Sequence, residues 1–240
     1  MKTTMRSARR SSRWRQIWRE AEALRRQSTL LPRKLGPRGV ALHPRDCEVD
    51  VVYVLHGVLA TAGVFEQIER RLRDAGVEHV ASFTYSPLRS VESLAQQLRR
   101  ECERIPEGAR LHLVGHSLGG IISRYYVQEE GGRSRVRQTI SLGSPFHGTT
   151  IARYLPPSLE DKLSPTSPVL AKLRDPARGA PEVPHLSIVA ADDMLVRPAM
   201  SAAFPIGDVE VLDDVGHNGL LFDPRVADLV CARICNDPPG

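Results

Sequence analysis

A serine held between two glycines constrains this chain more than any other feature. Residues 115–119 read Gly-His-Ser-Leu-Gly and directly follow the mainly apolar run 111–114. A strand that turns at once into a helix leaves no room for Cβ atoms beside the corner, and glycines at 115 and 119 remove them. Ser117 at such a corner adopts a strained backbone that lifts its hydroxyl clear of the sheet. The segment therefore predicts an accessible serine hydroxyl at the end of a buried strand.

The segments on both sides of Ser117 fit a strand-to-helix corner. Residues 118–130 carry apolar side chains at near-helical spacing, and residues 49–56 form a β-branched run typical of a second buried strand. If the serine attacks an acyl group, the developing oxyanion needs two fixed N–H donors. Leu118, directly after the serine, and Val58, just past the second strand, are the two candidates for this oxyanion hole.

Four segments, at 54–58, 113–120, 141–149 and 214–217, occur in the order found in the α/β-hydrolase superfamily. Over roughly residues 49–235 the chain resembles this superfamily, and within it the bacterial lipases and esterases. The third segment, Ser-Leu-Gly-Ser-Pro-Phe-His-Gly-Thr, resembles the lipase strand end that leads into a lid. The resemblance implies a Ser–His–Asp triad that hydrolyses carboxylic esters.

The base that would activate Ser117 also follows by elimination. Histidine titrates in the range that this role needs. In this architecture the acid and then the base follow the serine, which leaves three of the eight histidines, His147, His185 and His217. His185 begins a predicted strand at its far end, and His147 precedes any suitable acid. His217 follows the last predicted strand and is the predicted base.

The triad acid is one of two neighbours. The strand predicted over 185–191 ends in Asp192 and Asp193. Asp193 is favoured, because related lipases place a valine and then a proline shortly after the acid, and Val196 and Pro198 fit this pattern with one extra residue. Asp192 is then a turn residue. Asp213 and Asp214 lie near His217 in sequence and are also interpreted as turn acids.

Strands and helices alternate along residues 49–235, which predicts one α/β domain. The 240 residues, 41% of them hydrophobic, suffice for a sizeable core. The predicted fold is an α/β-hydrolase fold with a mostly parallel sheet of about six strands and helices on both faces. Strands are expected near 49–56, 79–85, 110–116, 137–143, 185–191 and 207–213, and helices near 63–75, 90–104, 118–130 and 224–235.

Residues 147–184 interrupt the alternation with seven prolines and short apolar pieces. Inserted after the strand end at 143–145, this segment is expected to lie over the catalytic edge as a small cap or lid that supplies an acyl-binding wall. The alternative is an ordinary long surface connection.

Residues 1–40 form a basic, partly helical N-terminal arm. They carry 12 Lys and Arg but only two Glu, a charge of +10, so residues 41–240 carry −5 and no nucleic acid is expected as a partner. An apolar helix face is predicted at Trp14, Ile17, Trp18, Ala21 and Leu24. Two roles stay open for it, contact with a membrane surface and docking on the protein's own body.

Together with the resemblance, these patterns predict a catalytic domain over residues 41–240 that cleaves small-molecule or lipid esters with an apolar acyl chain, through Ser117, His217 and Asp193. Acyltransferase or thioesterase activity at the same site is an alternative, as is a catalytically silent binding protein. No cofactor or metal is expected, since the four cysteines lack a Cys-x-x-Cys spacing. No signal peptide is recognised, so the cytoplasm is expected, with peripheral membrane contact as an option.

Overall fold

The computed structural model describes residues 3–5, 13–30, 49–58 and 60–236. Its centre is a seven-stranded sheet in the order β1-β7-β6-β5-β4-β2-β3, and every neighbouring pair is parallel. The strands are β1 (Thr3–Met5), β2 (Asp50–Leu55), β3 (His79–Ser82), β4 (Arg110–His116), β5 (Val136–Leu142), β6 (His185–Ala190) and β7 (Asp208–Leu212). The parallel arrangement brings the carboxyl ends of all strands to one edge.

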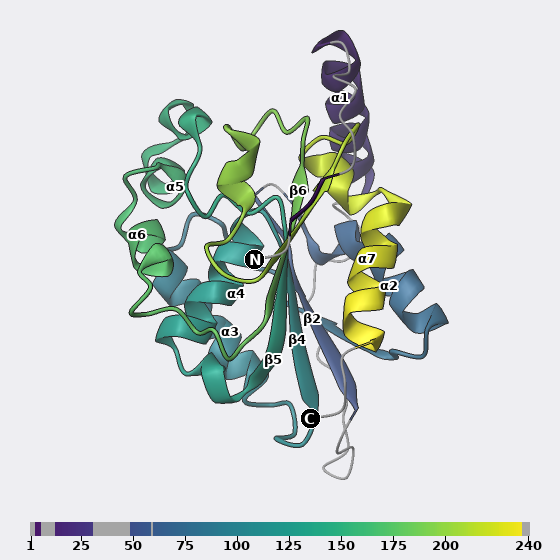
Figure 1. Cartoon of the computed structure of the whole chain (residues 1–240), viewed down its shortest axis with the longest axis vertical. Coiled ribbons are helices and arrows are strands. Elements are labelled where there is room, and N and C mark those ends of the chain that lie inside the picture. Colours follow the sequence, from purple (N-terminus) through teal and green to yellow (C-terminus); the bar gives the residue numbers. More distant parts are fainter. Residues whose placement is uncertain (1–2, 6–12, 31–48, 59, 237–240) are drawn as a thin grey trace.

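Helices cover both faces of the sheet, as predicted (Figure 1). The structure has α1 (Arg13–Leu30), α2 (Glu66–Asp74), α3 (Val91–Cys102), α4 (Leu118–Glu129), α5 (Pro157–Leu163), α6 (Pro168–Arg174) and α7 (Pro224–Cys235). Helices α3 and α4 pack together on one face, and α2 and α7 pack together on the other.

The core is divided between these two faces by the pleat of the sheet. Along the central strand β4, Leu111 and Leu113 join the apolar cluster under α3 and α4, whereas Val114 joins the cluster under α2 and α7. All three side chains are fully buried. Full burial of such a side chain stabilises the fold by about 1.5–3 kcal/mol, so both layers fix the strand whose end carries the serine.

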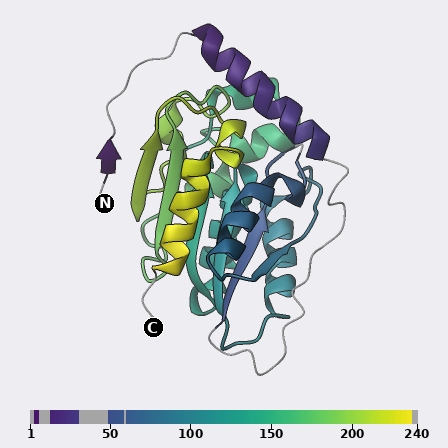
Figure 2. The same ribbon diagram turned by 90° about the vertical axis from the view of Figure 1, so that its right-hand side faces the viewer.

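The six predicted strands are all present, and residues 3–5 add a seventh, β1, at the edge of the sheet. β1 pairs in parallel with β7, with Thr3 opposite Val209 and Met5 opposite Val211. Figure 2 shows β1 beside the sheet and α1 lying across its carboxyl edge. The described part of the arm therefore belongs to the folded body. The predicted boundary between residues 40 and 41 lies outside the described residues.

The insertion at 147–184 contains a 3-10 turn (Thr150–Tyr154) followed by α5 and α6. Hydrogen bonds attach this insertion to the side of the molecule where α3 and α4 lie. The Gln128 side chain donates to the Leu173 carbonyl at 3.4 Å, and Lys162 donates to the Pro87 carbonyl at 2.6 Å. Figure 1 shows both helices on this side. Its action as a lid stays a prediction.

Candidate active site

Ser117 forms the corner between β4 and α4 by itself. The strand ends at His116, the helix begins at Leu118, and Ser117 between them has φ 54° and ψ −119°. A residue other than glycine with positive φ has a strained backbone, and such strained residues are common at functional sites. The predicted glycines allow this corner, because a Cβ at Gly119 would overlap the Leu55 carbonyl.

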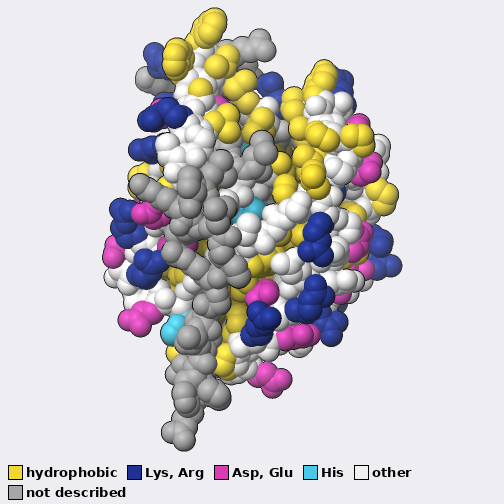
Figure 3. Space-filling view, turned by 180° about the vertical axis from the view of Figure 1, so that it is seen from behind, with side chains coloured by type: hydrophobic (Ala, Val, Ile, Leu, Met, Phe, Trp, Pro, Cys, Tyr) yellow, Lys and Arg dark blue, Asp and Glu magenta, His cyan; other side chains and the backbone are white. Residues whose placement is uncertain are grey.

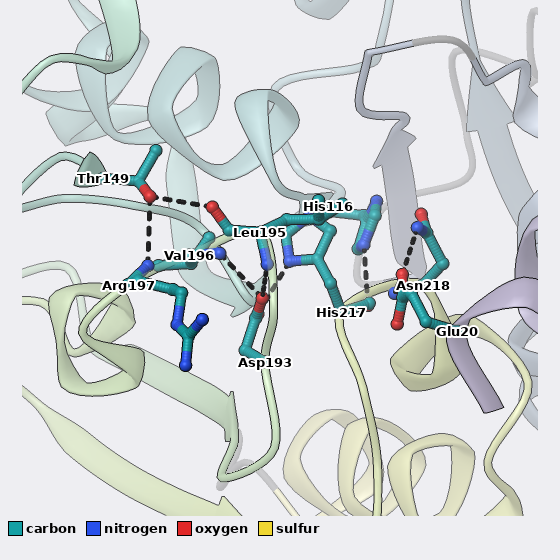
Figure 4. A network of polar contacts seen from close by, with 9 residues as sticks. All are labelled: Glu20, His116, Thr149, Asp193, Leu195, Val196, Arg197, His217 and Asn218. Carbon is teal, nitrogen blue, oxygen red and sulfur yellow. Dashed lines mark hydrogen bonds and ion pairs between the residues drawn. The ribbon is translucent and has the colours of Figure 1, made fainter. Parts of the chain in front are cut away.

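Asp193 and His217 meet from two different loops at the carboxyl edge. Asp193 follows β6, His217 follows β7, and the Asp193 Oδ2 lies 2.8 Å from the His217 Nδ1 (Figure 4). The other carboxylate oxygen, Oδ1, accepts amide N–H bonds from Leu195 at 2.8 Å and Val196 at 2.7 Å. The buried carboxylate is thus fixed by three hydrogen bonds, and it sets the orientation of the imidazole.

The surroundings of His217 favour its protonated form. Burial of the imidazole acts against protonation, but the charge of Asp193, the hydrogen bond to it and the charge of Glu20 outweigh that effect. The pKa of His217 therefore lies above its ordinary value of 6.5. The neighbouring carboxylates stabilise the positive charge that this imidazole gains when it accepts a proton.

His116 connects the corner at Ser117 to the loop that carries His217. Its Nε2 donates to the His217 carbonyl at 3.2 Å, and the two rings lie 4.8 Å apart between centroids. Burial, together with the nearby His217, holds the pKa of His116 well below its ordinary value, so this ring stays neutral. Among the hydrogen bonds of the described residues, none joins Ser117 to His217. Such bonds often tighten only when substrate is bound.

The two predicted oxyanion donors come from segments next to Ser117, the start of α4 and the turn after β2. Leu118 is the first residue of α4, where amide N–H groups have no partner within the helix. Val58 lies in the turn after β2, directly after Gly57. A Cβ added at Gly57 would come within 3.0 Å of the Ser117 Cβ, so this turn borders the corner closely.

A histidine and a tyrosine hold the turn that carries Val58. The His56 Nδ1 donates to the Gly57 carbonyl at 2.8 Å, and the Tyr85 hydroxyl donates to the His56 carbonyl. The two rings stack with centroids 4.2 Å apart and an angle of 10° between their planes. Because both side chains are buried, packing as well as hydrogen bonds fixes the turn.

The other candidate acids have different partners. Asp192 is half-buried, and its Oδ1 accepts from the Gln16 side chain at 2.6 Å. Asp214 has φ 63° and forms an exposed ion pair with Arg19 at 3.0 Å, which agrees with its interpretation as a turn acid. Of the two neighbouring aspartates after β6, Asp193 is the one that bonds to His217.

Glu20 is a residue near the site that the sequence reasoning missed. Its buried carboxylate reaches from α1 to Asn218, the residue after His217 (Figure 4). Its Oε1 accepts one hydrogen bond from the backbone N–H of Asn218 at 3.1 Å and another from the Asn218 side-chain Nδ2 at 2.5 Å. One signal could have drawn attention to it, since Glu20 is one of only two acids in an arm with 12 basic residues.

His185 lies in the core, away from this edge. Its ring contacts the hydroxyls of Thr139 at 2.7 Å and Ser141 at 3.1 Å, and it packs edge-on against Phe146. Burial and the charge of Arg124 hold its pKa well below the ordinary value, so it is a poor proton acceptor. We interpret His185 as a structural residue. Within the described ranges, no cluster of His, Cys, Asp and Glu could hold a metal ion.

Comparison with known proteins identifies relatives of this architecture. The model of a protein family described as palmitoyl protein thioesterase matches residues 51–175. No curated protein matches the chain. Among solved structures, Aspergillus fumigatus lipase B has a TM-score of 0.68 and 18% identity over 85% of this chain, which spans 57% of that enzyme.

Two bacterial structures match most of their own length. A lipase of Bacillus licheniformis in its mature form has a TM-score of 0.62 and 16% identity, over 83% of this chain and 96% of its own. The lin2722 gene product of Listeria innocua has a TM-score of 0.62 and 15% identity, over 80% of this chain and 96% of its own. These likenesses confirm the predicted α/β-hydrolase fold.

Proposed function

We propose that this chain, which belongs to the palmitoyl protein thioesterase family, is a serine hydrolase that cleaves esters of apolar acyl chains with Ser117, His217 and Asp193. The family and the fold identify it as a hydrolase of the lipase, esterase and thioesterase kind. The observation that carries the proposal is the buried Asp193–His217 bond at 2.8 Å, beside a serine held at positive φ.

In this mechanism the Ser117 hydroxyl attacks the acyl carbonyl and His217 accepts its proton. Because the His217 Nδ1 is bound to Asp193, the proton goes to Nε2. The amides of Leu118 and Val58 stabilise the negative charge on the tetrahedral intermediate. His217 then protonates the leaving group, and water hydrolyses the acyl-enzyme by the same steps in reverse order.

Three alternatives differ from this proposal in the leaving group, in the acceptor of the acyl group, or in having no catalytic activity. A thioester substrate is the strongest second candidate, since the matched family is a thioesterase family. An acyltransferase would pass the acyl group to an acceptor other than water. A catalytically silent binding protein of this fold would leave all such acyl groups in place.

A hydrolysis screen over two matched substrate series tests the proposal. One series contains p-nitrophenyl esters and the other acyl thioesters, each from short to long acyl chains, with Ser117→Ala as the control. We expect Ser117-dependent turnover that rises with acyl length in at least one series. The series with the higher kcat/KM identifies the leaving group. Turnover only with an added alcohol indicates a transferase, and none at all indicates the silent protein.

The proposed substrates partition into lipid, and α1 has a surface suited to a lipid interface. The apolar face predicted from the sequence faces solvent, with Trp14 and Trp18 each 73% exposed. Figure 3 shows hydrophobic side chains gathered at the projecting end of α1, at the upper left. No helix in the described residues is long and apolar enough to cross a membrane.

We therefore assign an anionic lipid surface as the partner of this face. Tryptophan side chains favour the boundary between water and lipid, and arginines beside them attract anionic headgroups. Arg15, Arg25 and Arg26 are exposed on the same helix. The helix borders the catalytic edge, where Leu195 and Met200 are also exposed, so binding here would bring the site to the lipid. Sedimentation with anionic vesicles measures this contact.

A further inference from the structure

Helix α1 docks on the protein through a polar face, contrary to the usual amphipathic pattern. The side chains turned toward the body include Glu20, Ala23 and Gln27, all buried. The large apolar side chains, those of Trp14, Ile17, Trp18 and Leu24, lie on the opposite side and are exposed. Burying polar groups without partners is unfavourable, so the contacts of this face decide where the helix lies.

Those contacts reach the loops of both predicted triad partners. Gln16 donates to Asp192, the residue before Asp193, at 2.6 Å. Glu20 accepts two hydrogen bonds from Asn218, the residue after His217. A Cβ at Gly216 would overlap the second Glu20 oxygen, Oε2, so the carboxylate lies directly against the histidine loop. That Oε2 atom is buried without a hydrogen-bond partner.

We propose that Glu20 is a positioning residue that holds the His217 loop in its active geometry through Asn218 and places a second negative charge beside the imidazole. This inference rests on the proposed function, because it assigns Glu20 a part in the same reaction. A carboxylate that accepts from both a backbone and a side-chain donor fixes the loop more firmly than a neutral acceptor does. Helix α1 thereby becomes part of the catalytic apparatus.

The groups that face His217 come from three directions. Asp193 bonds to its Nδ1 from the loop after β6, His116 packs against its ring from the end of β4, and Glu20 approaches from α1. His116 stays neutral, so the negative charges are those of Asp193 and Glu20. Both raise the pKa of His217. Removing the Glu20 charge must therefore lower it.

Two substitutions separate the charge of Glu20 from its hydrogen bonds. Glu20→Gln keeps an acceptor for Asn218 and removes the charge. We expect its plateau kcat to stay within about threefold of wild type and the acidic limb of kcat/KM to move to lower pH. Glu20→Ala removes both, so we expect the same displacement and a kcat lower by about tenfold, with KM for a soluble ester unchanged.

Glu22→Gln is the matched control, because Glu22 lies on the same helix but is exposed and paired with Arg25 at 2.8 Å. It should leave both kcat and the pH profile unchanged. Circular dichroism of every variant checks that α1 is still folded. The inference is overturned if the acidic limb stays in place in both Glu20 variants, or if the lower kcat of Glu20→Ala only follows a lower folded fraction. If wild type itself shows no Ser117-dependent activity, the proposed function fails instead.

Discussion

Asp193 and His217 are 24 residues apart in the sequence, and their side chains meet at 2.8 Å with both groups buried. The same carboxylate is held by two backbone amides on its other oxygen. A buried carboxylate with these partners keeps one imidazole tautomer and one ring orientation. The proposed reaction depends on this pair.

Replacing the serine or the histidine should abolish turnover to a similar extent. Ser117→Ala and His217→Ala are each expected to lower kcat by roughly 10³-fold or more, and the double variant should be little worse. The two groups act as one proton-transfer unit, so their losses do not multiply. Steady-state kinetics on a short-chain ester measures this, and multiplied losses would contradict a shared unit.

The two neighbouring aspartates should differ sharply. Asp193→Asn is expected to lower kcat by about 10⁴-fold, the size of this effect in serine proteases, because an amide neither fixes the tautomer nor offsets the imidazolium charge. Asp192→Asn is the matched control and should change kcat by less than about tenfold, since Asp192 contacts α1 instead. The reverse ranking would move the acid to Asp192.

The pH profile should report the raised pKa of His217. Only the neutral imidazole accepts the serine proton, so kcat/KM should be low at acid pH and rise as pH passes through this pKa. Since Asp193 and Glu20 raise it, the midpoint of the rise is expected above pH 6.5 in the wild-type protein. A midpoint below 6.5 would mean that burial, and not charge, governs this histidine.

The serine corner should not tolerate a methyl group. Gly119→Ala places a Cβ on the Leu55 carbonyl, so we expect unfolding free energy to fall by about 2 kcal/mol or more, measured by urea denaturation. Gly179→Ala is the control, because its Cβ would lie 3.4 Å from the nearest atom. That change should stay within about 1 kcal/mol. Equal losses in the two variants would argue against the tight corner.

The exposed tryptophans should carry vesicle binding. Trp14→Ala with Trp18→Ala is expected to abolish sedimentation with phosphatidylserine-containing vesicles at low salt, while hydrolysis of a soluble ester persists. Replacement of both by Phe should keep most of the binding. Salt should weaken the attraction, since each basic residue near the surface contributes about 1 kcal/mol. Wild-type protein that stays in solution at low salt would refute the lipid partner.

Much of this arrangement was predictable because it depends on local patterns. Strands buried on both faces are continuous apolar runs, so β2 and β4 were found within a residue of their ends. The glycines at 115 and 119 mark a corner that few other residues could form. His217 followed from the order of elements along the chain. Each of these signals lies within one segment of the sequence.

The features that were missed depend on contacts between distant segments. β1 is only Thr-Thr-Met, too short to show alternation, and its place comes from pairing with β7. The docked face of α1 is polar, so hydrophobic periodicity indicated the opposite side of the helix. Glu20 and Asn218 are 198 residues apart, and no local pattern links them. Periodicity finds elements, but such polar partners are defined only by the folded structure.

Labelling with a fluorophosphonate probe tests the central claim most directly. The probe forms a covalent bond with a serine hydroxyl only where a base and oxyanion donors activate it. We expect wild-type protein to gain one adduct, located by peptide mass spectrometry at Ser117, and His217→Ala to lose this labelling almost completely. An unlabelled wild-type protein, or an adduct on another serine, would contradict the proposal that Ser117 is the nucleophile of a serine hydrolase.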